Sequence, residues 1–159
     1  MTRTAARELA VRLCYAAQIS GADSTETVES FFTPEYFETL AEEDPIFSEY
    51  PDETQMAYIR TLTGLVYEHY YELNNEIERY ARGWRLDRIS KIASTILRCA
   101  MCEILYVEDV PAGAAANEAV ELAKRYEEPE TAAFINGILG SFIRDNTAES
   151  PAEVEAAEQ

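Results

Sequence analysis

Positive charge is scarce in this 159-residue sequence. Only 13 Lys and Arg residues stand against 30 Asp and Glu residues, which gives a formal net charge of −17. A strongly negative protein repels nucleic acid, so binding to phosphates requires a local positive face. The composition therefore excludes a protein that is basic over its whole surface.

Long apolar runs and a disulfide framework are also missing. No stretch approaches the roughly 20 consecutive apolar residues of a membrane span, and the N-terminus lacks the apolar core of a secretory signal. Three cysteines form an odd and sparse set that fits a reducing compartment. We expect a soluble cytoplasmic protein without membrane association, long enough to bury the core of one domain.

Side chains arranged for catalysis or metal binding are lacking as well. His69 is the only histidine and has no neighbouring nucleophile, so we expect a surface or half-buried role. Cys99 and Cys102 could form a redox pair or half a zinc site, but no second Cys or His pair completes it, and we expect both to pack in the core. The sequence predicts no enzyme, no catalytic or metal-binding residues and no cofactor.

The few basic residues that are present concentrate in two segments. Residues 1–12 carry +2, from three arginines less one glutamate, and residues 79–98 carry +5, from six basic residues less one aspartate. Between them, residues 22–55 hold eleven acidic residues and no Lys or Arg. Two basic patches on an acidic protein keep local RNA binding possible.

Apolar residues recur at helical spacing along most of the chain, and no period-2 pattern competes. Start signals support this: Thr33 precedes Pro34, Asp52 and Gln55 match a capping box, and Asp87 can cap a helix. We expect an all-α fold, a single compact bundle of about seven helices with short connections. The predicted helices span 3–19, 25–32, 34–41, 52 to the turn at Gly83, 88–106, 111–126 and 129–144.

The C-terminal segment differs from the rest in composition. The stretch "TAESPAEVEAAEQ" has Val154 as its single bulky apolar residue, which is too little to offset the entropy of ordering. We therefore expect a helical domain over residues 1–146 and a flexible acidic tail over residues 147–159.

Trp84 lies among Arg82, Arg85 and Arg88. An indole in that setting can stack on a base while the arginines hold phosphates. The alternative is a packed indole at a corner between helices, because Gly83 marks a turn that a large apolar side chain would stabilise. We favour the packed indole at this stage.

Four stretches resemble the NusB family of transcription antitermination factors: "ARELAVRLCY" (6–15), "WRLDRISKIASTILRCAMCEILY" (84–106), "DVPAGAAANEAVELAKRY" (109–126) and "FINGIL" (134–139). The resemblance covers most of the chain outside residues 22–52 and the tail. It implies the seven-helix NusB fold. We expect either a monomer or a homodimer. It also implies three partners: the ribosomal protein NusE, the boxA element of ribosomal RNA transcripts as single-stranded RNA, and the RNA polymerase antitermination complex.

The same resemblance implies a set of RNA-binding residues: Arg3, Arg7, Tyr15, Arg98, Glu130 and Phe134. Arg98 has an equally weighted alternative, an ion pair with Glu103 or another acid inside the bundle, because a buried arginine needs a partner. Thr4, Ala5 and Ala133 stand where relatives often carry basic residues. An alternative function is therefore a protein-interaction adaptor with the NusB fold and weakened or lost RNA binding.

Overall fold

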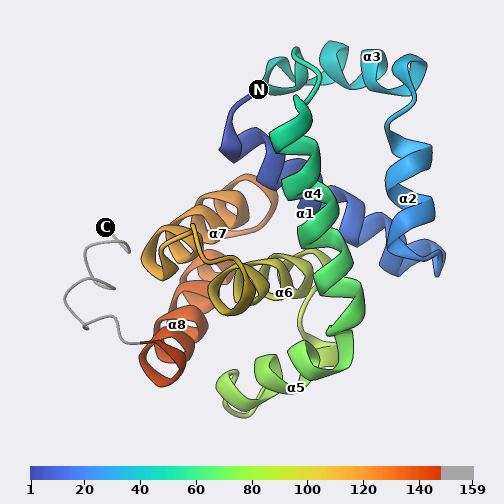
Figure 1. Cartoon of the computed structure of the whole chain (residues 1–159). Coiled ribbons are helices and arrows are strands. Elements are labelled where there is room, and N and C mark those ends of the chain that lie inside the picture. Colours follow the sequence, from blue (N-terminus) through green and yellow to red (C-terminus); the bar gives the residue numbers. More distant parts are fainter. Residues whose placement is uncertain (148–159) are drawn as a thin grey trace. The chain divides into compact units, whose positions relative to one another are not determined.

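The computed structural model describes residues 1–147 (Figure 1). This part of the chain contains eight α-helices and two 3₁₀ turns and no strand, which confirms the predicted all-α class. None of the helices in it is long and apolar enough to cross a bilayer. Residues 148–159, which make up nearly all of the predicted acidic tail, lie outside the described residues.

The chain divides into two compact units, the first covering residues 1–68. In this unit α1 packs mainly against α4 and also against α2. Its elements are α1 (Arg3–Ser20), α2 (Ser24–Phe31), α3 (Pro34–Glu43), the 3₁₀ turn η1 (Pro45–Phe47) and α4 (Glu53–Glu68).

The helix starts of the first unit follow the capping signals in the sequence. The Thr33 hydroxyl accepts a hydrogen bond from the Tyr36 N–H at 3.4 Å, and Pro34 opens α3. Before α4, Asp52 and Gln55 cap each other: the Gln55 N–H donates to Asp52 at 2.8 Å, and the Asp52 N–H donates to Gln55 at 3.0 Å. This reciprocal pair is the capping box that the sequence predicted.

The second unit covers residues 69–159, of which 69–147 are described. Helices α7 and α8 pack on each other and on α6, and α5 packs on α6 and α8. Every residue from Ala93 to Glu103 is buried, so α6 is the core helix of this unit. Its elements are α5 (Tyr70–Tyr80), the 3₁₀ turn η2 (Leu86–Arg88), α6 (Lys91–Tyr106), α7 (Ala112–Tyr126) and α8 (Pro129–Asn146).

Two boundaries differ from the prediction. The long helix expected from Asp52 is broken at His69, where φ is −102° and ψ is 19°, and this break makes eight helices instead of seven. The His69 ring stacks on Tyr106 at 4.5 Å between ring centroids, a tertiary contact that no local pattern reveals. Ser90, not Asp87, caps α6: its hydroxyl accepts the Ala93 N–H at 3.1 Å, while Asp87 pairs with Arg85.

The two cysteines of the Cys99–Cys102 pair lie in the core, as predicted. Cys99 is 2% exposed and Cys102 is fully buried, and both are free thiols. Their position on α6 gives them the role of small apolar side chains. Among the described residues, no group of three Cys, His, Asp or Glu side chains is placed to hold a metal ion.

Candidate nucleic-acid interface

A tight turn after α5 positions Trp84. Gly83 has φ +82° and Arg82 has φ +30°, and the Trp84 N–H donates to the Ala81 carbonyl at 3.3 Å. The left-handed region is open to glycine without steric cost, so Gly83 lets the chain reverse here. The turn leaves Trp84, the one tryptophan of the chain, 54% exposed, although tryptophan side chains are mostly buried in folded proteins.

The Trp84 ring contacts Phe134 of α8. The ring centroids lie 5.7 Å apart with an interplanar angle of 57°, within the range of attractive aromatic pairs. The ring packs at the turn as the packed-indole interpretation predicted, and Trp84 also remains 54% exposed. The exposed Trp84 ring, packed on the half-buried Phe134 ring, is available to a further planar ligand.

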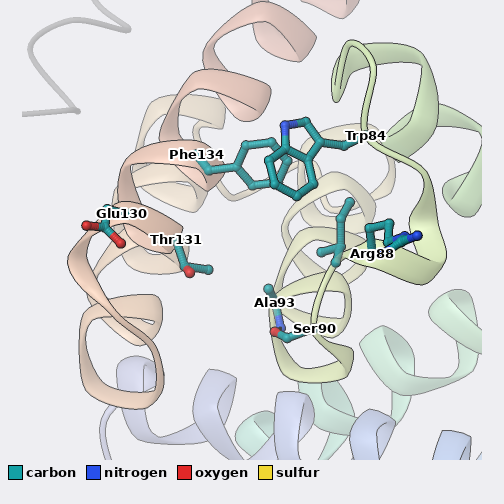
Figure 2. A pocket seen from close by; sticks show the side chains of 8 residues that line it. Trp84, Arg88, Ser90, Ala93, Glu130, Thr131 and Phe134 are labelled. Atoms are coloured by element: carbon teal, nitrogen blue, oxygen red, sulfur yellow. The ribbon is translucent and has the colours of Figure 1, made fainter.

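These two rings line one part of a pocket of about 380 Å³ (Figure 2). Glu130 and Thr131, from the first turn of α8, lie on one wall, and Arg88, Ser90 and Ala93 lie on the other. Ile89 completes the lining. Glu130 and Phe134 are one helical turn apart, so α8 brings two of the predicted RNA-binding residues to the same pocket.

Positive charge borders the pocket. The Arg88 and Lys91 side chains are exposed, and neither makes an ion pair with an acid in the part of the chain that the structure describes. Arg85 is engaged, because its guanidinium lies 3.2 Å from the Asp87 carboxylate. Arg88, which lines the pocket, and Lys91, which follows the lining residue Ser90 in the chain, are therefore the cations available to an incoming phosphate.

The lining matches what single-stranded RNA offers. Exposed aromatic rings stack on unpaired bases, and the strand's phosphates pair with nearby cations. Glu130 can accept hydrogen bonds from a base amino group, and the Thr131 hydroxyl can donate or accept one. The pocket thus offers surfaces for stacking, for charge pairing and for hydrogen bonds to base edges.

Three of the predicted RNA-binding residues lie on α1, in the first unit. Arg3 is exposed, and its guanidinium carbon lies 4.2 Å from the centroid of the Tyr58 ring on α4. Arg7, one turn later, is 5.9 Å from the same ring and only 6% exposed. Tyr15 is 37% exposed and lies about 12 Å further along the helix axis than Arg7. The unit therefore brings Arg3 and Arg7 together and leaves Tyr15 two turns away.

The start of the chain is tied to the first unit. The Gln55 amide donates to the Met1 carbonyl, and the Met1 ammonium pairs with Glu49 at 2.8 Å. The hydrogen bond and the charge of this ammonium lower the pKa of the Glu49 carboxyl. The Thr2 hydroxyl accepts the Ala5 N–H at 3.0 Å and caps α1. The backbone at Arg3 is thus already ordered in the free protein, which reduces the conformational entropy that Arg3 would lose on binding a ligand.

Arg98, by contrast, is 2% exposed. Its guanidinium donates to Asn74 at 2.8 Å and lies 4.7 Å from the centroid of the Tyr70 ring. The hydroxyls of Ser94 and Thr95 accept longer hydrogen bonds at 3.4 Å. This geometry supports the internal role that the sequence left open, with polar and aromatic partners holding α5 against α6, and it does not present Arg98 to RNA.

The RNA-binding set predicted from the sequence did not include Trp84, Arg88, Ser90 or Thr131, although Trp84 and Arg88 together form a group that could stack on a base and hold phosphates. The dense basic segment 79–98 was a signal for Arg88, but helix periodicity alone does not reveal that α8 and η2 line the same pocket. Ser90 was also hidden by the incorrect prediction of Asp87 as the cap.

Comparisons with known proteins agree on one family. The model of the NusB family matches residues 4–144. The transcription antitermination protein NusB of Thermoanaerobacter sp. (strain X514) is 39% identical over 150 residues, covering 94% of this chain and 95% of the relative. The solved structure of T. maritima NusB matches with a TM-score of 0.75 at 24% identity, covering 98% of both chains. A chain from a structure described as "Crystal Structure of a Plectonemic RNA Supercoil" matches with a TM-score of 0.73 at 22% identity, covering 94% of this chain and all of that one.

Proposed function

This chain belongs to the NusB family, and from that premise we propose that it binds boxA-type single-stranded RNA of ribosomal RNA transcripts together with the ribosomal-protein partner NusE. It acts as a non-enzymatic adaptor in the cytoplasm, within the antitermination complex of RNA polymerase. The observation that supports RNA binding is the exposed Trp84 ring, packed on the half-buried Phe134 and close to the cations Arg88 and Lys91.

At this pocket, one or two bases stack on the Trp84 and Phe134 rings. Arg88 and Lys91 neutralise the flanking phosphates, and Glu130 selects bases that carry an amino group. In this arrangement the few basic residues lie along the path of the RNA strand, and the rest of the protein surface stays negatively charged.

The N-terminal arm supplies a second set of contacts. Arg3 is exposed and ordered, so it pairs with a phosphate, and Tyr15 is exposed enough to stack on a base. Arg7 is mostly buried against Tyr58 and contributes through one edge of its guanidinium. Arg98 contributes indirectly, by holding α6 in place.

NusE binding belongs to the acidic part of the protein. Residues 22–55 hold eleven acidic residues and no basic ones, and most of these carboxylates are exposed. A basic ribosomal protein meets an oppositely charged surface there, which accelerates association. The same segment favours a second candidate function, an adaptor that binds the protein partner but has weak RNA affinity of its own.

Titration of a boxA-type RNA, with and without NusE at moderate salt, tests the proposal. We expect binding with NusE and weaker binding without it. Binding of NusE alone, with no RNA retention in either titration, would leave the adaptor as the function. Folded protein that binds neither would contradict both.

Replacing Arg3 by alanine should weaken RNA binding without changing NusE binding. The loss of one phosphate contact lowers the slope of log K against log salt by about 0.7 for a single strand. Arg60→Gln is the matched control, because it removes one exposed arginine that pairs with Glu29 and not with RNA. Equal slopes for Arg3→Ala and the wild type would remove Arg3 from the interface.

A further inference from the structure

A second pocket, of about 290 Å³, lies in the same unit. It is lined by Arg79, Tyr80, Arg82, Ser141, Arg144 and Asp145. Three guanidinium groups meet at one hollow in a protein whose net charge is −17, which concentrates almost a quarter of its 13 basic residues there. Such a concentration of positive charge needs a negative ligand or an internal acid to balance it.

The pocket's own acid, Asp145, does not balance it. The Asp145 carboxylate accepts the Tyr80 hydroxyl at 2.8 Å. Burial and this hydrogen bond raise the pKa of Tyr80, so the hydroxyl keeps its proton and continues to donate to Asp145. One oxygen of the Asp145 carboxylate is therefore hydrogen-bonded to a neutral partner. Within residues 1–147, Asp145 forms no ion pair with the three arginines of the pocket.

Each arginine of the pocket is weakly engaged. Arg79 makes a long ion pair with Glu76 at 3.9 Å, beyond hydrogen-bonding distance, and its guanidinium carbon lies 5.5 Å from the centroid of the Tyr80 ring. Arg144 donates to the neutral Ser141 hydroxyl at 3.2 Å. Arg82 makes no ion pair or hydrogen bond with the side chains that the structure describes. Their guanidinium donors are thus available for an anion.

The two pockets are lined by residues of the same two elements. Arg82 and Trp84 belong to the same turn, with Arg82 in one pocket and Trp84 in the other. Along α8, Phe134 lines the first pocket and Ser141 lines the second; seven residues is two helical turns, so both lie on the same face, about 10 Å apart along the axis. One strand can therefore occupy both pockets within a few nucleotides.

We propose that the arginine pocket binds backbone phosphates of the RNA just beyond the bases that stack on Trp84 and Phe134. This inference rests on the proposed function and extends the RNA path to the C-terminal end of α8. Planar guanidinium groups bind phosphate oxygens in pairs, and this recognition is independent of base sequence. The pocket therefore adds affinity and salt dependence but no base preference.

The test compares a core boxA-type RNA with the same RNA lengthened by a few nucleotides at its 5′ end or at its 3′ end. One of the two longer RNAs should bind more tightly than the core, and its salt slope should be steeper by about 1.4, for two added contacts. The double variant R82G/R144Q should abolish this gain and leave the affinity for the core unchanged. Glycine adopts the positive φ of residue 82 without strain, so folding is preserved.

The control variant R60Q/K124Q removes two charges from positions outside both pockets and should keep the gain. Two results would overturn the assignment of this pocket without affecting the proposed function. The first is equal affinity of the wild type for the core RNA and for both longer RNAs, and the second is a gain in affinity that persists in R82G/R144Q. Inorganic phosphate that binds at the arginines while the longer RNAs gain nothing overturns it too. If the core RNA does not bind, the proposed function is wrong, and the proposed binding of RNA phosphates in this pocket is wrong as well.

Discussion

Replacing Trp84 by alanine is expected to weaken RNA binding by about 1–3 kcal/mol, or roughly 5- to 150-fold in Kd, the usual contribution of one aromatic ring stacked on a base. The ring is 54% exposed, it contacts Phe134 at 5.7 Å, and it lines the pocket with Arg88. Its removal takes away the larger of the two stacking surfaces. Equilibrium titration of a boxA-type RNA with the variant and the wild type measures the change.

Two further variants make this result specific. Trp84→Phe keeps an aromatic ring at the turn and should retain most of the affinity, while Phe134→Ala should lose affinity in the same direction as Trp84→Ala. Because the side chain is more than half exposed, the alanine variant should unfold at nearly the wild-type urea concentration. Wild-type affinity in Trp84→Ala would place the RNA elsewhere on the protein.

Arg98→Ala is expected to lower the free energy of unfolding by about 3–5 kcal/mol. The substitution removes the donor of the Asn74 side-chain carbonyl, and an orphaned group of this kind costs about 1–3 kcal/mol. The Ser94 and Thr95 hydroxyls lose their weaker bonds to the guanidinium but still donate to the Lys91 carbonyl. The substitution also opens a cavity in a core where the arginine is 2% exposed, and cavities of that size add a similar penalty. Urea unfolding followed by circular dichroism measures the loss.

RNA binding separates this structural role from the direct contact that the family resemblance implied. Arg98→Met keeps much of the packed volume and should lose less stability than Arg98→Ala. Under conditions where both variants are folded, their RNA affinity should stay close to that of the wild type. A variant of wild-type stability with strongly reduced RNA affinity would restore Arg98 to the interface.

The helices could be predicted from the sequence because their signals are local. Apolar spacing and capping residues depend only on neighbours within one or two turns, and the Asp52–Gln55 pair forms the predicted reciprocal hydrogen bonds. The break at His69 could not be predicted in this way. No Gly or Pro lies between residues 65 and 82, and the His69–Tyr106 stack joins residues 37 positions apart in sequence.

The candidate site shows the same division. The basic segment 79–98 was visible in the sequence, but the sequence does not tell which arginine faces solvent and which faces the core. Arg88 and Arg98 are ten residues apart in one basic segment, yet Arg88 borders the pocket and Arg98 is buried among Asn74 and Tyr70. Burial depends on how α5 and α6 pack, which is a property of the fold and not of charge patterning.

Trp84 is the single tryptophan of the chain, so intrinsic fluorescence reports directly on whether RNA binds at this residue. Titration of a boxA-type RNA while intrinsic fluorescence is recorded follows that one ring, with ionic strength held constant. A base stacked on Trp84 should quench the emission along the same curve that an independent binding measurement gives, and high salt should reverse both. RNA that binds while the Trp84 emission stays unchanged would contradict the placement of RNA at the Trp84–Phe134 pocket.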